Sequence, residues 1–339
     1  MSNHNPVSRS CMACRGFSLV ELMVALVITL ILLAGVGQIF LGSKKSFNIQ
    51  DSLGRMQENG RYAMETVVAD LRRAGYWGGN SDIGDIGDFT PAGVSNGNKV
   101  ADENGTCTGT TWTRMLTHRI FGKNDDRTGY GCLPSMTGPR GDVLVLRFAT
   151  PWKIPSITTP AGFMASNPKH FFLRTSLFRG ALFEGEDEGS HSITGSAVRT
   201  SELLSRAYFI HESSATNKCT AAGNVPSLYR FSYINGNPVS EEIAYGVDQF
   251  QVQYGLDTDG DDSVDNYANA AAPADTMWEQ VIAARIWLLV RSECPETGYT
   301  NTNSYEMGDL TGAAAYTPND SYRRQLYSST VRLRNVAPE

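Results

Sequence analysis

The sequence predicts an α+β protein in which one long amino-terminal α-helix precedes an antiparallel, β-rich carboxy-terminal head. Residues 17–41 form an apolar run without Lys, Arg or Pro, and a helical pattern continues from there to Gly75. Beyond residue 77 the composition changes to Gly, Asn, Asp, Thr and Ser, interrupted by short runs of β-type residues. With 41% hydrophobic and 19% charged residues, the chain of 339 residues has ample material for a folded core.

The apolar run predicts a transmembrane helix, because 25 helical residues rise about 37 Å and a bilayer core is about 30 Å thick. Its single ionisable side chain is Glu21. A carboxylate in hydrocarbon costs about 2.5–3.5 kcal/mol, so we expect Glu21 to have a charged partner. A polar leader with Arg9, Arg15 and no acid precedes Gly16, the reverse of the order in a secretory signal. Cleavage after Gly16 would leave the apolar helix at the new amino terminus.

The pattern after the apolar run predicts that the helix continues as an amphipathic segment that ends at Gly75. The apolar stripe comprises Leu53, Met56, Ala63, Val67, Leu71 and Ala74, and the polar sides comprise Arg55, Glu58, Arg61, Glu65, Asp70, Arg72 and Arg73. We therefore expect a leader (1–16), a membrane-spanning half (17–41), an amphipathic half (42–76) and a globular head (77–339).

Short apolar runs predict the strands of the head. We expect strands at residues 142–148, 171–177, 207–211, 227–234, 281–290 and 325–335, and a long loop over 78–112. Apolar residues alternate with Gln251 and Gln253 up to Leu256, which predicts a half-buried strand there. The more apolar segment 281–290 is expected to be a central strand. Gly-rich separators favour antiparallel pairing over βαβ units.

The segment Gly16-Phe17-Ser18-Leu19-Val20-Glu21 resembles the class III signal of type IV prepilins and related pseudopilins. The resemblance implies a pilin-like fold, cleavage after Gly16 by prepilin peptidase and N-methylation of Phe17. It also implies that Glu21 pairs with the terminal amine of an adjacent subunit, which is physically sensible because a cation makes a buried carboxylate tolerable. Segments 245–254, 278–291 and 322–335 are similar to blocks of PilW-like minor pilins.

The resemblance implies a minor pilin subunit of a type IV pilus that primes assembly or sits at the tip. The implied partners are other minor pilins, the major pilin, the prepilin peptidase and the inner-membrane assembly machinery. The implied location is the inner membrane, with the head in the periplasm, and then the pilus. Two alternatives stay open: a pseudopilin of type II secretion, whose members are generally shorter, and a calcium-dependent adhesin at the pilus tip.

Four cysteines remain after the leader, an even number on the exported side of a membrane anchor. They allow three pairings, and the sequence does not select one. We expect Cys107–Cys132 and Cys219–Cys294, because the first pair would enclose a short loop in one Gly-rich region. Each bridge could contribute about 2–4 kcal/mol. A zinc site is not expected, since the only CxxC motif leaves with the leader.

The acidic loop, residues 257–265, has the sequence DTDGDDSVD and resembles a calcium-binding loop. The oxygen ligands would be Asp257, Asp259, Asp261, Asp265 and the Ser263 carbonyl. Two departures weaken the match: Asp262 stands where glycine is usual, and Ala268 stands where a bidentate glutamate is usual. Calcium is therefore a possible ligand, and a solvated turn is the alternative.

The sequence offers little support for catalysis. It contains no GxSxG, HExxH or P-loop motif, and no dinucleotide-binding fingerprint after a strand. His118, His170, His191 and His211 lie in unrelated contexts, and the acidic run 184–188 is expected to be a solvated loop. The net charge of −6 also argues against direct binding of nucleic acid, which requires a surplus of Lys and Arg. We expect a structural protein and not an enzyme.

Overall fold

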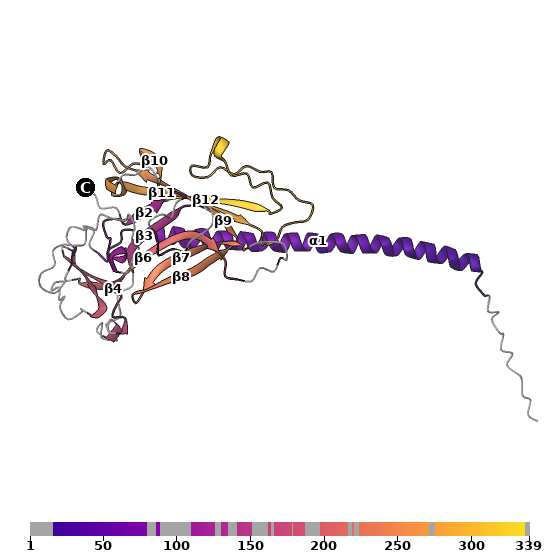
Figure 1. The fold of residues 1–339 in the computed structure, drawn as a ribbon, viewed down its shortest axis with the longest axis horizontal. Helices are drawn as coiled ribbons and strands as arrows, with labels where there is room; N and C mark the ends of the chain where they lie inside the picture. The colour runs from indigo at the N-terminus through magenta and orange to yellow at the C-terminus, as the bar shows by residue number, and fades with distance from the viewer. Residues whose placement is uncertain are drawn as a thin grey trace, which may run out of the picture. The chain divides into compact units, whose positions relative to one another are not determined.

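A computed structural model describes residues 16–79, 86–88, 110–125, 130–134, 141–150, 162–163, 166–177, 179–186, 197–215, 219, 224–270 and 275–335 (Figure 1). The chain forms two compact units, Met1–Leu53 and Gly54–Glu339. The helix α1 (Leu19–Leu71) contributes residues to both units. The expected limits of the membrane-spanning half, the amphipathic half and the head stay predictions.

The part of α1 in the second unit belongs to the core of the head. Met56, Ala63, Val67 and Leu71 are buried, as the apolar stripe predicts. Gly60 permits the closest contact, since a Cβ there would lie 2.3 Å from a ring carbon of Tyr327. Only a glycine lets that ring lie against the helix backbone.

The helix ends at Leu71, four residues before the predicted end, and a turn leads to Gly75. Gly75 has φ of +76°, the left-handed conformation that favours glycine at helix ends. Its N–H donates to the Arg147 carbonyl at 3.0 Å. The side-chain amide of Asn335 lies 3.2 or 3.3 Å from the carbonyl oxygens of residues 72, 73 and 74. Carbonyl oxygens of the turn after α1 thus receive a hydrogen-bond donor from the opposite end of the chain.

Eight strands form the first sheet, in the order β1-β5-β4-β6-β3-β2, with β7 beside β6 and β8 beside β7. All neighbours are antiparallel except β1 and β5. A short helix, α2 (Thr110–Thr113), precedes β2. The strands are β1 (Ile86–Asp88), β2 (Ile120–Lys123), β3 (Val143–Ala149), β4 (Phe171–Thr175), β5 (Gly180–Glu184), β6 (Arg199–Glu212), β7 (Pro226–Ile234) and β8 (Asn237–Tyr245).

The first sheet agrees only in part with the predicted strands. β3, β4, β6 and β7 overlap predicted strands, although β6 is much longer than the expected 207–211. β2, β5 and β8 were not predicted, and β1 lies within the expected loop 78–112, so that prediction is wrong at this point. β1 is too short, and β8 too polar on its exposed side, for hydrophobic periodicity to reveal them.

The second sheet has four antiparallel strands in the order β10-β9-β11-β12. They are β9 (Val247–Leu256), β10 (Asn266–Asn269), β11 (Val281–Arg291) and β12 (Arg324–Arg332), with two short 3-10 helices, η3 (Asp275–Trp278) and η4 (Gly312–Ala314), between them. The central position of β11 is confirmed. The expectation of a half-buried β9 is wrong, because Gln251 on its polar face is fully buried and donates to Asp125 at 3.1 Å.

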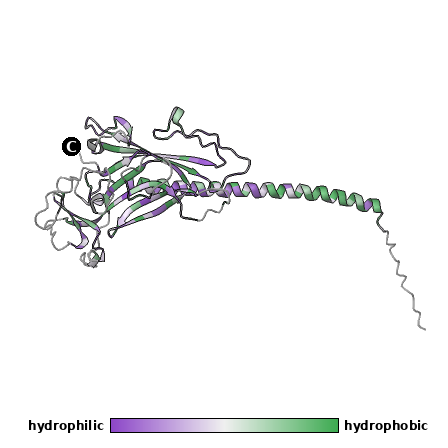
Figure 2. Ribbon diagram, viewed as in Figure 1, coloured by the Kyte–Doolittle hydropathy of each residue, from purple (hydrophilic) through white to green (hydrophobic). Residues whose placement is uncertain are grey.

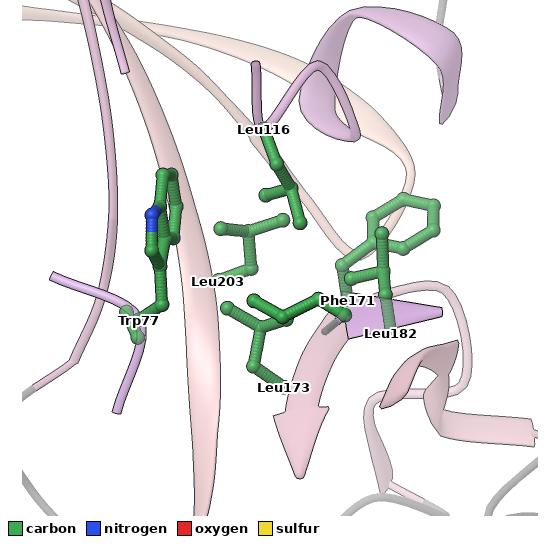
Figure 3. Packing of buried hydrophobic residues seen from close by; sticks show 8 residues of the cluster. Trp77, Leu116, Phe171, Leu173, Leu182 and Leu203 are labelled. Carbon is green, nitrogen blue, oxygen red and sulfur yellow. The ribbon is translucent and has the colours of Figure 1, made fainter. Parts of the chain in front are cut away.

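A hydrophobic cluster packs Trp77, just beyond α1, against the first sheet (Figure 3). Phe171 and Leu173 of β4 and Leu182 of β5 face Trp77 and Leu116. All of these side chains are buried. Each buried side chain of this size stabilises the fold by about 1.5–3 kcal/mol. The end of the helical region is therefore held by apolar packing as well as by hydrogen bonds.

Candidate functional site

The first unit presents an apolar helix with no covering. In the most apolar 18-residue window of α1, none of the residues is buried, and the helix is long and apolar enough to cross a membrane. Figure 2 shows the hydrophobic colour concentrated in the amino-terminal part of this helix. The hydroxyl of Thr29 donates to the Ala25 carbonyl at 2.7 Å, so this polar group is satisfied within the helix. Such a surface needs lipid or other apolar helices around it.

The predicted processing and assembly residues lie at the start of this helix. Gly16 and Phe17 precede α1, and Phe17 is exposed. Ser18 caps the helix, because its side-chain oxygen accepts the Glu21 N–H at 3.3 Å. This cap places Glu21 in the first turn, where a carboxylate is favoured by the helix dipole. The Glu21 side chain is exposed, so its carboxylate is open to a group from another chain.

A buried polar cluster joins the last turn of α1 to β6. The Asp70 carboxylate accepts Nη1 of Arg206 at 2.7 and 2.9 Å and the Tyr208 hydroxyl at 2.6 Å. Burial, and next the Asp70 charge, raise the pKa of the Tyr208 hydroxyl, which therefore stays protonated as a donor. Asp70 is 2% exposed, so the prediction that it lies on a polar, solvated side of the helix is wrong. Besides Arg73 at 3.4 Å on the same helical region, its two closer partners come from a strand over 130 residues away, which no local pattern reveals.

The disulfide Cys219–Cys294 is present and joins residues 75 positions apart. It links the segment between β6 and β7 to the segment after β11. Cys132 is also disulfide-bonded, but Cys107 lies outside the described residues, so the pairing Cys107–Cys132 stays a prediction.

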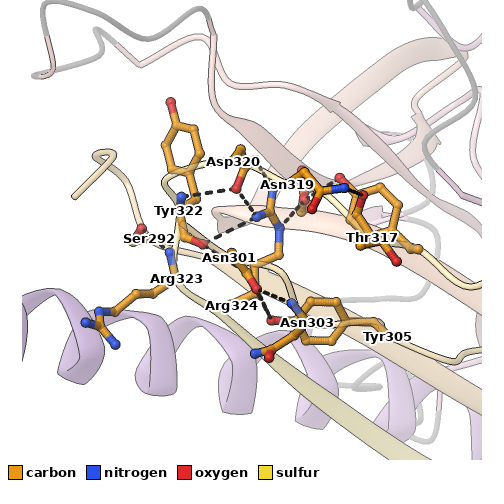
Figure 4. A network of polar contacts seen from close by, with 12 residues as sticks. Ser292, Asn301, Asn303, Tyr305, Thr317, Asn319, Asp320, Tyr322, Arg323 and Arg324 are labelled. Atoms are coloured by element: carbon orange, nitrogen blue, oxygen red, sulfur yellow. Dashed lines mark hydrogen bonds and ion pairs between the residues drawn. The ribbon is translucent and has the colours of Figure 1, made fainter. Parts of the chain in front are cut away.

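Arg324, at the start of β12, organises the segment between β11 and β12 (Figure 4). Its Nε lies 2.7 Å from Asp248, and its two terminal nitrogens lie 2.5 and 2.7 Å from the two oxygens of Asp320. Only 1% of the Arg324 side chain is exposed. The fork of the guanidinium matches both carboxylates, and these bonds raise the pKa of Arg324 although its burial acts to lower it.

The acidic loop brings some of its predicted ligands together. Oxygen atoms of Asp257, Asp259 and Asp265 all lie within 4.8 Å of one another. Asp261 is not in this group; its carboxylate accepts the Ser263 N–H at 2.7 Å. Hydrogen bonds from the Thr258 side chain and N–H lower the pKa of Asp265, so it is ionised at neutral pH. The three carboxylates could hold a hard cation such as Ca²⁺.

The other polar candidates have structural roles where they are described. His170 contacts Glu202 at 2.9 Å, and the rings of His211 and Tyr229 lie edge to face. His118 is buried, and His191 lies outside the described residues. Glu184 is 3.5 Å from Lys169, which also contacts Glu186, so these two acids of the run 184–188 are paired and not simply solvated.

Two protein-family models match separate parts of the chain. Residues 11–37 match the prokaryotic N-terminal methylation motif, and residues 207–335 match PilW, the type IV pilus-assembly protein W. The carboxy-terminal part of the chain thus resembles PilW, and the two matches support a structural role as a minor pilin. The second match begins in β6 and includes β7 to β12, the disulfide and the Arg324 network. The methylation motif and the apolar helix indicate a membrane anchor with the head outside.

Two further comparisons add context for this PilW-like pilin. Among solved structures it is similar to a type IV-like pilin from Thermus thermophilus, with 14% identity over 86% of this chain and 99% of that chain. The TM-score of that match is 0.33, too low to compare the two folds in detail. No curated protein matches the chain. Its family and fold are those of a structural protein.

Proposed function

We propose that this minor pilin is cut after Gly16, methylated at Phe17 and held in the inner membrane with its head in the periplasm. It then joins other minor pilins in a complex that primes assembly of a type IV pilus or caps its tip. Prepilin peptidase, the major pilin and the inner-membrane assembly machinery are its partners in this sequence of events.

The observation that carries the proposal is the uncovered apolar helix with a single carboxylate in its first turn. Glu21 is the only ionisable residue between residues 17 and 41. When the helix leaves the lipid and packs against helices of neighbouring subunits, this carboxylate needs a cation as its partner. The terminal amine that cleavage creates on Phe17 of an adjacent subunit supplies one. The resulting ion pair sets the axial position of one helix against the next.

The size of the head supports an initiating or terminal position. Removal of the leader leaves 339 − 16 = 323 residues, most of them in the second unit. A subunit of this bulk is difficult to repeat along a thin fibre. A single copy at the tip, or a few copies in an initiation complex, avoids that crowding.

Deletion of the gene, with complementation as the control, tests the proposal. We expect surface pili to be lost and to return when the wild-type chain is expressed. Normal pilus numbers in the deletion strain would contradict a role in assembly. If attachment alone were lost, the adhesin alternative would replace the proposal.

A further inference from the structure

A group of oxygen-bearing side chains, separate from the acidic loop, lies where the two sheets meet. We call it the buried oxygen cluster: Asn124, Asp125, Gln251 and Asp309. Asn124 and Asp125 follow β2 directly, Gln251 lies in β9, and Asp309 lies in the segment between β11 and β12. Three distant parts of the chain therefore bring only carboxylates and carboxamides to one place.

The hydrogen-bond donors of this cluster are already engaged within it. The amide nitrogen of Asn124 donates to Asp309 Oδ2 at 2.7 Å. The amide nitrogen of Gln251 donates to Asp125 Oδ1 at 3.1 Å, and the Gly141 N–H donates to the same oxygen at 3.1 Å. These bonds join the four side chains in two pairs, Asn124 with Asp309 and Gln251 with Asp125, and they fix which atoms of the two amides are oxygen.

Among the residues that the structure describes, three buried oxygens of the cluster receive no hydrogen bond. They are Asn124 Oδ1, Gln251 Oε1 and Asp309 Oδ1. Gln251 is 0% exposed, and a Cβ on Gly308 would lie 2.8 Å from its Oε1, so this oxygen faces the backbone beside Asp309. A buried acceptor without a partner is destabilising. Three of them together indicate a ligand that offers positive charge to oxygen.

The surrounding charges point the same way. Fully buried Asp142 accepts the Asp125 N–H at 3.0 Å and the Val252 N–H at 2.7 Å. Burial raises the pKa of Asp142 to about 8, and the carboxylates of Asp125 and Asp309 act in the same direction. Burial, and next the Asp309 charge, also raise the pKa of Asp125. Within the described part of the chain, the charged groups that act on these two side chains are thus other carboxylates.

We propose that the buried oxygen cluster binds one Ca²⁺ ion, with the carboxylates of Asp125 and Asp309 and the amide oxygens of Asn124 and Gln251 as ligands. Carboxylate and amide oxygens suit a hard cation, and the absence of nitrogen and sulfur ligands from this set disfavours zinc and copper. Ca²⁺ accepts such irregular sites more readily than Mg²⁺, which demands near-octahedral geometry. The ion ties the end of β2 to β9 and to the segment before β12. This inference goes beyond the role in pilus assembly and does not depend on it.

Equilibrium dialysis of radioactive calcium against the detergent-solubilised full chain tests the site. The Asp259→Ala background removes the acidic loop as a competing site. We expect this variant to bind one Ca²⁺ per chain and the additional substitution Asp309→Asn to weaken that binding at least tenfold. Equal calcium uptake by the two variants, or no uptake by the Asp259→Ala chain, would overturn the proposal.

A second test uses Asn124→Asp in the same Asp259→Ala background, where calcium binding is expected to tighten and not to weaken. A third carboxylate among the four ligands adds negative charge, so we expect calcium binding to tighten by about tenfold. If Asn124 only donates a structural hydrogen bond to Asp309, the substitution will not tighten binding, and that result would overturn the proposal. The intrinsic tryptophan fluorescence of the head, to which buried Trp278 contributes, verifies that each variant is folded.

Discussion

The Asp70 carboxylate lies 2.7 Å from Nη1 of Arg206, and 3% of the Asp70 side chain and 19% of the Arg206 side chain are exposed. The pair connects the last turn of α1 to the longest strand of the first sheet. A carboxylate so deeply placed is stable only with its partners, and Tyr208 provides a second one at 2.6 Å. The helix that anchors the chain is thereby fixed to the head by a charged contact.

Asp70→Ala is expected to destabilise the head by about 3–5 kcal/mol, since it leaves the Arg206 charge buried without its partner. Thermal unfolding of the full chain in detergent, followed by tryptophan fluorescence, measures the loss. All five tryptophans lie beyond residue 76, so the signal reports on the head. Glu65→Ala is the matched control, because Glu65 pairs with Arg61 at 3.9 Å on an exposed face. Such a pair contributes about 0.3–0.5 kcal/mol; similar losses for both variants would contradict the assignment.

Glu21→Ala is expected to leave processing and membrane insertion intact but to prevent entry into the minor-pilin complex. The substitution removes the carboxylate that meets the terminal amine of a neighbouring subunit. Co-purification of the tagged variant with the other minor pilins measures the effect, and Glu58→Ala, an exposed acid farther along the same helix, is the control. Normal recovery of the Glu21→Ala complex would refute the pairing.

The Arg324 network predicts a loss of stability at acid pH. Burial alone would raise the pKa of Asp320, but hydrogen bonds from Arg324 and the Tyr322 N–H leave it lowered. A lowered pKa contributes stability above the unfolded-state value of about 3.9, and this contribution is lost as the pH falls through the folded-state pKa. Asp320→Asn should therefore cost about 1.5 kcal/mol at pH 7, the low end for a charged hydrogen bond.

Urea unfolding of both chains at pH 7 and at pH 3 checks this expectation. The difference between wild type and Asp320→Asn should shrink at pH 3, which lies below the unfolded-state pKa of about 3.9, so that the carboxyl is mostly protonated in the unfolded chain. Glu306→Gln, which changes an exposed acid of the same segment, should show little effect at either pH. A difference that is the same at both pH values would mean that the charge of Asp320 is not what stabilises the segment.

The acidic loop is predicted to take up calcium between Asp257, Asp259 and Asp265. The ion should raise the unfolding temperature of the chelator-treated chain, since it binds only the folded loop. The Asp309→Asn chain should keep the part of this gain that comes from the acidic loop. Asp259→Ala should abolish that part. Asp262→Asn removes an equal charge at a residue outside the carboxylate group and should keep the gain. If the Asp309→Asn chain unfolds at the same temperature with and without calcium, the loop is a solvated turn.

Patterns in the local spacing of residues predicted the fold class and the amino-terminal site. The 25-residue apolar run, the Gly16–Glu21 motif and the stripe from Met56 to Leu71 each depend on local spacing, and the helix and its burial agree with them. The central strand β11 is recognisable for the same reason, since burial on both faces makes it nearly continuously apolar.

Contacts between distant segments could not be predicted in this way. Asp70 looks like any polar helix residue until β6 places Arg206 and Tyr208 around it. Gln251 looks like the solvent side of an alternating strand until Asp125 covers it. One missed element did have a local signal: Asn235-Gly236, both with positive φ, forms the two-residue turn that joins β7 to β8.

Mass spectrometry of the amino-terminal peptide, taken from this protein in sheared surface filaments, tests the central claim most directly. A peptide that begins with N-methylated Phe17 would establish cleavage after Gly16 and incorporation into the pilus in one measurement, and this is the predicted result. An intact leader in whole cells would contradict processing as a prepilin. Processed chain found only in the membrane fraction, and never in filaments, would contradict a place in the pilus itself.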